Sequence, residues 1–321
     1  MVGRYEIDVY NNRVHFHLEV KRNITVIQGD SATGKTQLIR LLSDYNNSGV
    51  SFGVTVVSEA PCAVLTTSAW KQKALPGPGS IVFVDEDFAP MYSEEFARYI
   101  KGADDYFVLI CRDSLFELPY SIEEIYGMRQ GRPSQKYSSA KRVYNELFAL
   151  FNVKCGSTFR PDCVITEDSN AGHVFLSCVY ESECVSAGGK SSVADCISRE
   201  AQSGKKTLAI VDGAAYGADM EKTMRLMDYY KDRSALYAPE SFEYLLLSAG
   251  IVEVQEELIK ETWNYADSSE FFSWEDFYTK TLSTASAGTV FQYNKGHLNE
   301  AYKTKGCIES VKRILPEEIR P

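Results

Sequence analysis

The feature that most constrains the fold is an eight-residue segment, Gly29-Asp30-Ser31-Ala32-Thr33-Gly34-Lys35-Thr36, placed between two regular apolar patterns. Residues 24–27 before it are apolar or β-branched and predict a short buried strand. After it, apolar residues recur at helical spacing over residues 38–42. A buried strand, a glycine-rich turn and an amphipathic helix in this order are typical of an α/β fold with parallel strands.

The turn has the pattern G-x-x-x-x-G-K-T, which is suited to binding phosphate. The glycines allow backbone N–H groups to point at a phosphate, and the helix N-terminus adds a partial positive charge. Lys35 supplies a cation for the β- and γ-phosphates, and the Thr36 hydroxyl is placed to ligate Mg²⁺. We therefore expect residues 29–36 to bind a nucleoside triphosphate, with ATP and Mg²⁺ as the cofactors. The alternative is a glycine-rich turn before a helix that binds nothing.

An acidic pair, Asp85-Glu86, follows a second predicted buried strand at residues 81–84. At the end of a strand beside the glycine-rich turn, Asp85 would hold Mg²⁺ through water, and Glu86 would orient or deprotonate an attacking water. The alternative is a surface pair after a core strand. Arg112 follows a predicted strand at residues 107–111 and is a candidate sensor of the γ-phosphate, although a structural salt bridge explains it equally well.

Together these segments resemble the Walker A and Walker B motifs of P-loop NTPases, over roughly residues 1–125. The resemblance implies an ATPase in which Lys35, Glu86 and Arg112 are catalytic. Arg129 and Arg132 are further candidates as arginine fingers, but the composition of the segment around them favours solvated linker charges. Residues 5–20 alternate apolar and polar around Asn11-Asn12 and predict a β-hairpin, which is similar to the ABC and SMC-like branch that includes OLD-type ATPases. Because the chain lacks the L-S-G-G signature of that branch, the subfamily stays open.

The alternation of strands and helices predicts a mainly parallel sheet with helices on both faces. Residues 127–137 lose the apolar pattern and predict a linker, and a connecting helix is expected after it, with Val143, Leu147 and Leu150 on one stripe. We therefore expect a P-loop NTPase domain at 1–126, a linker and connecting helix at 127–160, and a smaller α/β domain with a helical tail at 161–321. In this last domain the patterns predict strands at 164–166, 174–176 and 208–211 and helices near 192–203 and 218–231.

Three segments of this second domain carry a further resemblance. One predicted strand leads to Glu167, residues 187–191 form a glycine-rich turn before a helix, and another strand leads to Asp212. They resemble a Toprim domain, the small metal-binding α/β fold of topoisomerases, primases and OLD-type nucleases, which implies a second metal site at Glu167 and Asp212. Ala214 stands where the second aspartate of the D-x-D motif belongs. A degenerate Toprim-like domain, an active nuclease and an unrelated α/β domain therefore all stay open, with Asp219, Glu240 and Glu243 as substitute acids.

Composition limits the function classes. A formal net charge of −10 over 321 residues argues against broad binding to nucleic acid, although a local patch of the second domain would still accept DNA or RNA. No apolar run is long enough to span a membrane, and the eight cysteines are scattered without a C-x-x-C pair, so we expect a cytoplasmic protein with reduced thiols. A homo-oligomer is compatible with all of this.

Three functions follow as expectations. The first is an Mg²⁺-dependent ATPase that regulates a nucleic-acid-related or defence-type activity of the second domain. The second is a nucleotide-gated interaction module with little turnover and no nuclease activity. A small-molecule kinase is the third, and Glu86 counts against it because such kinases usually lack an Asp-Glu pair at this strand end.

Overall fold

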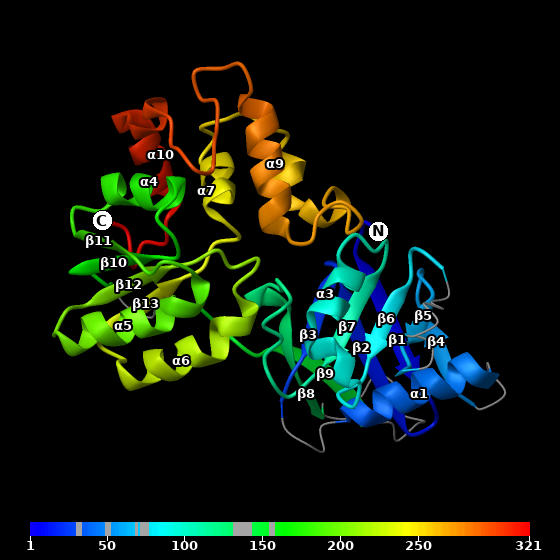
Figure 1. The fold of residues 1–321 in the computed structure, drawn as a ribbon. Helices are drawn as coiled ribbons and strands as arrows, with labels where there is room; N and C mark the ends of the chain where they lie inside the picture. Colours follow the sequence, from blue (N-terminus) through cyan, green and yellow to red (C-terminus); the bar gives the residue numbers. More distant parts are fainter. Residues whose placement is uncertain (30–33, 49–52, 68–69, 71–76, 131–142, 154–157) are drawn as a thin grey trace. The chain divides into compact units, whose positions relative to one another are not determined.

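The structure is a computed structural model that describes the chain except for residues 30–33, 49–52, 68–69, 71–76, 131–142 and 154–157. The chain forms two compact units, shown in Figure 1. The first contains Met1–Phe151 and Trp263–Phe272, and the second contains Asn152–Thr262 and Ser273–Pro321. The division therefore falls after residue 151, and a ten-residue segment of the C-terminal half belongs to the first unit.

A nine-stranded sheet forms the first unit, in the order β4-β1-β2-β9-β8-β3-β7-β6-β5. Its strands are β1 (Tyr5–Tyr10), β2 (Val14–Val20), β3 (Ile24–Ile27), β4 (Thr55–Val57), β5 (Cys62–Val64), β6 (Ile81–Val84), β7 (Tyr106–Ile110), β8 (Ile125–Gln130) and β9 (Val143–Ala149). The run β8-β3-β7-β6-β5 is parallel, whereas the pairs β1–β2, β1–β4 and β8–β9 are antiparallel. The α/β class and the hairpin at residues 5–20 are confirmed, but the sheet is mixed rather than a simple parallel one.

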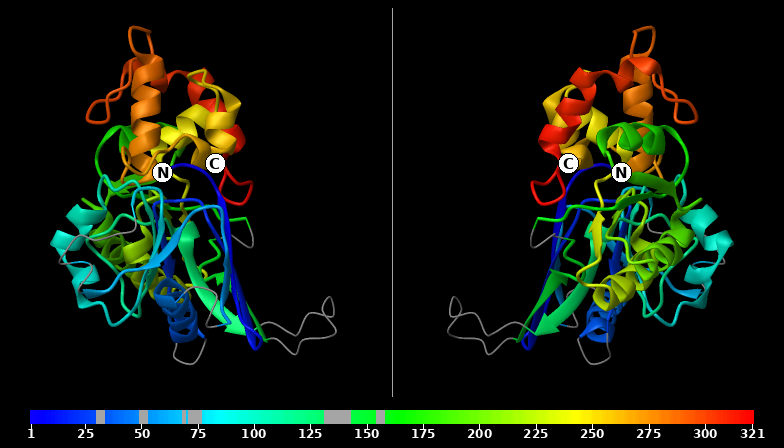
Figure 2. Two further views of the ribbon diagram at one scale, coloured as in Figure 1. Left: turned by 90° about the vertical axis from the view of Figure 1, so that its right-hand side faces the viewer. Right: turned by 90° about the vertical axis from the view of Figure 1, so that its left-hand side faces the viewer.

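Helix α1 (Lys35–Ser48) packs against both edges of this sheet, contacting β5 at one edge and β1 and β4 at the other. The sheet is thereby curled into a nearly closed, barrel-like shape, and Figure 2 shows the helix against its strands. Leu38 and Leu42 are fully buried in the shared core. Burial of each such side chain contributes roughly 1.5–3 kcal/mol, which explains why the amphipathic pattern after Gly34 folds as a helix here. The short helix α3 (Glu94–Ile100) is capped by Ser93, whose hydroxyl accepts the N–H of Phe96.

Two expectations for the middle of the chain are wrong. Residues 127–130, predicted as part of a linker, belong to β8, and residues 143–149, predicted as a helix, form β9. These strands pair with each other, and β9 also pairs with β2. The apolar residues Val143 and Leu147 therefore pack against the sheet core from a strand. The remaining predicted linker residues lie outside the described part of the chain.

The second unit has a parallel sheet in the order β11-β10-β12-β13. Its strands are β10 (Cys163–Thr166), β11 (Glu183–Ser186), β12 (Thr207–Ile210) and β13 (Ser234–Tyr237), and its helices are α4 (Ala171–Val179), α5 (Val193–Gln202), α6 (Met220–Tyr229) and α7 (Phe242–Ser248). In Figure 1, α5 and α6 lie on one face of this sheet and α4 and α7 on the other. The predicted strands at 164–166 and 208–211 and both predicted helices are confirmed. The predicted strand at 174–176 is wrong, since those residues lie inside α4.

The remainder of the chain forms the helical tail that the sequence predicts. It contains α8 (Glu256–Lys260), α9 (Trp274–Ser286) and α10 (Lys305–Ile314). Short 3-10 helices occur at Ala89–Tyr92, Ile122–Glu124, Lys190–Ser192, Gly217–Asp219, Thr262–Asn264 and Glu300–Lys303. Within the described residues, no helix is long and apolar enough to cross a membrane. The seven cysteines in the described part of the chain are all free thiols.

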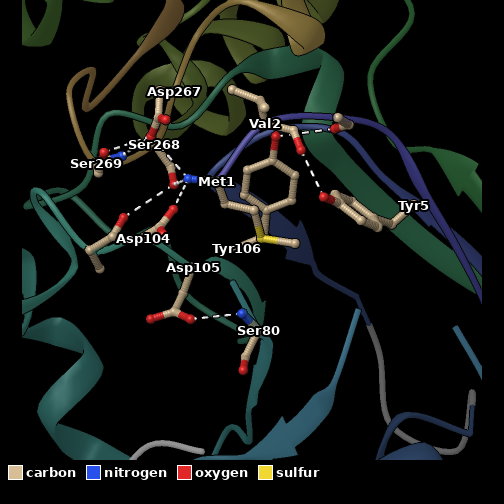
Figure 3. A network of polar contacts seen from close by, with 12 residues as sticks. Met1, Val2, Tyr5, Ser80, Asp104, Asp105, Tyr106, Asp267, Ser268 and Ser269 are labelled. Atoms are coloured by element: carbon tan, nitrogen blue, oxygen red, sulfur yellow. Dashed lines mark hydrogen bonds and ion pairs between the residues drawn. The ribbon is translucent and has the colours of Figure 1, made fainter. Parts of the chain in front are cut away.

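The segment Trp263–Phe272 is held to the first unit by the amino group of Met1, as Figure 3 shows. This group donates hydrogen bonds to the carboxylates of Asp104 and Asp267 and to the hydroxyl of Ser268. Backbone bonds add to the contact, because the N–H of Ser268 donates to the Met1 carbonyl over 3.0 Å. The segment Trp263–Phe272 is therefore bound to the first unit through the hydrogen bonds around Met1.

Candidate nucleotide-binding site and a second acidic pocket

The parallel strands of the first unit bring the predicted nucleotide residues to one edge. β3 pairs with β7, with Ile27 opposite Ile110, and β7 pairs with β6, with Leu109 opposite Val84. All three strands run in the same direction, so the residues that follow them meet at the same edge of the sheet. β7 lies between the strand before the glycine-rich turn and the strand before Asp85.

Both glycines of the turn adopt backbone conformations that favour glycine. Gly29 has φ 126° and Gly34 has φ 101°, which L side chains rarely adopt. A Cβ on Gly34 would lie 3.4 Å from the Phe16 ring and 3.5 Å from the Asn145 side chain, so the end of the turn packs closely against β2 and β9. Asp30, Ser31, Ala32 and Thr33, which were predicted to bind phosphate, lie outside the described residues.

Lys35 is the first residue of α1, and it is buried, with 6% of its surface exposed. Its ammonium group donates to the carbonyl oxygen of Gly29, at the other end of the glycine-rich turn. The side chain therefore reaches back across the turn toward the ends of the strands. Thr36 follows it on the first turn of the helix and is exposed.

Glu86 and Arg112 form a two-bond ion pair across the ends of β6 and β7. The Arg112 Nη2 lies 2.7 Å from Glu86 Oε1, and Nε lies 2.9 Å from Oε2. The hydrogen bonds from Arg112 lower the pKa of Glu86, and the charge of Lys35 acts in the same direction, while partial burial opposes both. The Gln28 amide donates to the Arg112 carbonyl over 3.1 Å and fixes the backbone at this point. The salt-bridge interpretation of Arg112 is thus realised, and a role in sensing γ-phosphate stays a prediction.

Asp85 lies beside this pair, and its Oδ1 accepts the N–H of Glu86 over 2.9 Å. Burial raises the pKa of the Asp85 carboxyl, and the neighbouring charges of Asp87 and Glu86 raise it further. A bound cation would be favoured here because it offsets the repulsion among these carboxylates. The donors at this edge, the Thr36 hydroxyl and the Asp85 carboxylate, are oxygen ligands of the type that Mg²⁺ prefers.

Arg129 is less suited to act as an arginine finger within the chain. Its guanidinium lies 5.4 Å from the centroid of the Phe148 ring and 3.9 Å from the Glu146 carboxylate, on the adjacent strand β9. Both contacts are on the exposed face of the β8–β9 pair. Arg132 lies outside the described residues.

In the second unit, Glu167 and Asp212 meet at the ends of the adjacent strands β10 and β12. The N–H of Asp212 donates to Glu167 Oε2 over 3.3 Å. Both side chains line a pocket of about 480 Å³, together with residues from α4, α7 and the loop before α10. The glycine-rich turn at 187–191 precedes a helix as predicted, and the Gly189 N–H donates to the Glu167 carbonyl over 2.7 Å.

Two further acids and one cation surround Glu167 and Asp212. Glu243 is buried and accepts the Tyr293 hydroxyl over 2.7 Å, and the Lys295 ammonium lies 2.5 Å from the Glu275 carboxylate. Burial raises the pKa of Glu167 to about 7, and it raises that of Asp212 well above its ordinary value, with the charge of Glu275 adding to both shifts. At neutral pH the pocket therefore holds protons as well as charges.

The fit to a metal ion in this pocket is incomplete. Of the substitute acids considered above, Glu243 lines the pocket, whereas Asp219 and Glu240 do not. Ala214, which replaces the second aspartate of the D-x-D pattern, is buried. In the described part of the chain, no three His, Cys, Asp or Glu side chains are arranged to hold a metal ion. Asp212 also has a structural partner, because its Oδ1 accepts the N–H of Phe242 over 2.9 Å at the start of α7.

Sequence reasoning did not single out Glu275, Tyr293 or Lys295. Glu275 lies in the first turn of α9, where an acidic residue is ordinary, and the other two lie in a loop that has no periodic pattern. Only the fold of the tail brings them to the ends of β10 and β12. The acidic residues Glu167 and Asp212 could be found because each directly follows an apolar run.

The fold and the site together define an α/β protein in which a glycine-rich turn, a buried lysine and an acidic pair share one sheet edge. Comparison with known proteins adds nothing to this description, because no protein-family model matches the sequence and no curated protein is significantly similar to it.

Proposed function

We propose that the first unit binds a nucleoside triphosphate, most simply ATP with Mg²⁺, and hydrolyses it. The observation that carries this proposal is the meeting of Lys35, Glu86 and Arg112 at the ends of three adjacent parallel strands. A lysine and an arginine at one edge offer two positive charges to a phosphate chain, and the helix N-terminus of α1 adds a third source of positive potential. The two glycines with positive φ supply a turn whose backbone can approach a ligand closely.

Each residue has a distinct part in the proposed reaction. Lys35 neutralises charge on the β- and γ-phosphates, and Thr36 and Asp85 hold the metal ion. Glu86 accepts a proton from a water whose oxygen attacks the γ-phosphorus, while the bond to the bridging oxygen of ADP breaks. Arg112 stabilises the charge that develops on the γ-phosphoryl oxygens.

The ion pair between Glu86 and Arg112 favours slow turnover in the absence of a trigger. A carboxylate that accepts two hydrogen bonds from a guanidinium is a weaker base than a free one. This observation supports the second candidate function, a nucleotide-gated module with little hydrolysis. The two candidate functions differ in what separates Glu86 from Arg112. In the ATPase the bound nucleotide or a partner frees Glu86 to act as a base, whereas in the interaction module the ion pair persists.

We further propose that the nucleotide state regulates the second unit, through an activity that concerns nucleic acid. The position of Glu167 and Asp212 at the ends of adjacent parallel strands supports this proposal, and the buried Ala214 weighs against full nuclease activity. Under this proposal the second unit resembles a Toprim domain that has lost one acid.

The test is ATP hydrolysis by the full chain, measured with and without DNA or RNA. Lys35→Ala should lose ATP binding, and Glu86→Gln should keep binding while hydrolysis falls by about 10²-fold or more, since it removes the general base. Arg98→Gln, which removes a positive charge from α3 of the same unit, is the matched control and should behave as wild type. No hydrolysis under any condition with ATP binding intact would leave only the interaction module, and equal ATP affinity in wild type and Lys35→Ala would refute the nucleotide site.

The same preparation tests the second unit. Cleavage of DNA or RNA that requires Mg²⁺ or Mn²⁺ and is lost in Glu167→Ala would establish a nuclease. Hydrolysis that is stimulated by nucleic acid without any cleavage would establish a regulatory role for a degenerate domain. Hydrolysis that is indifferent to both nucleic acids would refute the link to nucleic acid.

A further inference from the structure

The acidic pocket of the second unit lies at the topological switch point of its parallel sheet. From β10 the chain passes through α4 to β11 on one side, whereas β12 and β13 lie on the other side of β10. In open α/β sheets, ligands bind outside the carboxyl ends of the strands at such a point. Glu167 and Asp212 follow the two strands that flank it, and both line the pocket of about 480 Å³. The fold therefore places these two acids where a ligand site is expected.

Lys295 reaches this pocket from a loop that is anchored to two helices. Its carbonyl oxygen accepts the N–H of Ala171 over 3.1 Å, at the start of α4. Two residues earlier, the N–H of Tyr293 donates to the Ser286 hydroxyl over 2.9 Å, at the end of α9. The backbone on both sides of the Lys295 side chain is thus held in place by hydrogen bonds, and the position of this side chain follows from the fold of the tail.

The ammonium group of Lys295 forms one ion pair and keeps further donors for the pocket. Its Nζ donates to the Glu275 carboxylate over 2.5 Å. In the described part of the chain this is the one hydrogen bond that the Lys295 side chain makes, and an ammonium group carries three N–H donors. The remaining donors are available to the acids that line the same pocket, Glu167, Asp212 and Glu243.

The acids of the pocket are bound to groups of the chain and do not converge on one point. Glu167 accepts the N–H of Asp212 over 3.3 Å, and Asp212 accepts the N–H of Phe242 over 2.9 Å. Glu243 accepts the Tyr293 hydroxyl over 2.7 Å. A divalent cation such as Mg²⁺ or Ca²⁺ needs several oxygen ligands at about 2.0–2.6 Å. Among the described residues, no three acidic, histidine or cysteine side chains offer such an arrangement.

The charge of Lys295 supplies what a metal ion would otherwise supply. Carboxylates gathered in a small pocket repel one another, and a nearby positive charge offsets this repulsion. The same fixed charge repels a divalent cation, which would have to bind beside the ammonium group or displace it. Lys295 therefore both balances the acids and disfavours a metal ion at Glu167 and Asp212.

We infer that Lys295 takes the place of a metal ion in this pocket, as a cation built into the chain, so that Glu167 and Asp212 bind no divalent metal. The inference deepens the function proposed for the second unit and rests on it, because that proposal places the activity of the unit in this pocket. It narrows this activity to binding or regulation without cleavage that depends on Mg²⁺ or Mn²⁺. Ala214 and Lys295 then act in the same direction, one by removing a ligand and the other by replacing the metal.

The test follows the binding of Mn²⁺ to the nucleotide-free full chain by NMR. Bound Mn²⁺ broadens the amide signals near it, so a site at the ends of β10 and β12 is distinguished from a site at Asp85. Wild type should show no selective broadening at the ends of β10 and β12. Lys295→Gln keeps a donor for Glu275 but removes the charge, and in this variant Mn²⁺ should broaden these signals and bind about tenfold more tightly or better than in wild type.

Lys260→Gln is the matched control. The Lys260 Nζ also lies 2.5 Å from a glutamate carboxylate, that of Glu256, but this pair is exposed on α8 of the same unit. Its replacement should leave Mn²⁺ binding as in wild type. The double variant Lys295→Gln/Glu167→Gln should lose the gained site, and Lys295→Met serves as a second uncharged variant if Lys295→Gln does not fold.

Two outcomes would overturn the inference. One is selective broadening at the ends of β10 and β12 in wild type, and the other is the absence of a gained site in a folded uncharged variant of Lys295. Neither outcome bears on the proposed regulation, which is judged by ATP hydrolysis with and without nucleic acid. Hydrolysis that is indifferent to nucleic acid would refute that regulation, while Mn²⁺ binding would still decide the part played by Lys295.

Discussion

Arg112 is the residue whose contacts most directly set the chemistry of the candidate site. Both nitrogens that it presents to Glu86 are within hydrogen-bond distance, and these bonds are the main cause of the lowered pKa of that carboxyl. In Arg112→Gln, we expect the pKa of Glu86 in the nucleotide-free protein to rise toward its ordinary value. Carboxyl ¹³C NMR titration measures it directly.

The control for this prediction is Arg129→Gln. Arg129 pairs with Glu146 at 3.9 Å, outside hydrogen-bond distance, and is remote from Glu86 in sheet order. Its replacement should leave the titration of Glu86 unchanged. An unchanged titration midpoint of Glu86 in Arg112→Gln would mean that the ion pair does not form in solution. The proposal that Arg112 lowers the basicity of Glu86 would then be refuted.

Glu167 should make the stability of the second unit depend on pH. Burial raises the pKa of this carboxyl to about 7, above its value of about 4.5 in an unfolded chain. Because the unfolded chain releases this proton more readily, stability should fall as pH rises from about 4.5 to 7 and then level off, by at most about 3 kcal/mol. Asp212 contributes in the same direction. Hydrogen exchange of β10 and β12 amides, followed from pH 5 to 8 with a chelator present, measures the effect.

Glu167→Gln is the informative variant, because an amide oxygen can still accept the Asp212 N–H. Its β10 amides should be better protected than those of wild type at pH 8 and little different at pH 5. If the protection of the β10 amides changed equally with pH in the two proteins, ionisation of Glu167 would not destabilise the folded state.

At the scale of elements, helices and strands could be predicted from the sequence where the apolar residues followed a single clear pattern. The strands β3 and β6 are four-residue runs of apolar or β-branched residues that are buried throughout, and α5 and α6 have a clear apolar stripe. Residues 143–150 were predicted as a helix because Val143, Leu147 and Leu150 fit a helical stripe, whereas Val143 and Leu147 alone also fit one face of a strand. Only the pairing of β9 with β2 and β8 decides between the two, and such pairing is not local in sequence.

The opposite error occurred at residues 174–176. A three-residue apolar run is compatible with a strand or with part of a buried helix. In the structure Ala171, Phe175 and Val179 are buried at intervals of four, which is the pattern of α4. The strands β11 and β13 were also missed; β11 is half exposed, so it lacks the buried apolar run of its neighbours.

The site was predictable to a similar degree. Glu86 and Arg112 follow the apolar runs of β6 and β7, and Lys35 follows the glycine-rich turn after β3. Their meeting at one edge therefore follows from the parallel direction of three strands. A structural salt bridge was one of the two interpretations expected for Arg112, but Glu86 could not be predicted as its partner, because that choice depends on side-chain geometry rather than on strand order. The pocket of the second unit was found only in part, since Lys295 and Tyr293 come from a loop.

At the scale of the whole molecule, the chain passes between its two units three times, after residues 151, 262 and 272. The segment between the last two crossings therefore depends on the first unit for its structure. Asp267 is central to it, since its carboxylate lies 2.9 Å from the Met1 amino group and also accepts the Ser269 hydroxyl. Burial raises the pKa of this carboxyl, but the hydrogen bonds outweigh burial and lower the pKa to about 2.

Asp267→Asn should loosen this segment without unfolding the sheet. The carboxyl has a lowered pKa in the folded chain, so its contribution is present above about pH 4 and is lost as pH falls toward 2. The ion pair is partly exposed, and solvent screening limits its contribution to about 1 kcal/mol or less. Amides of residues 263–272 should therefore exchange up to roughly fivefold faster at pH 7, while those of β3 and β7 keep their protection. Asp228→Asn, the same change at an exposed position of α6, should leave the segment unaffected, and equal exchange in wild type and Asp267→Asn would show that backbone bonds alone hold the segment.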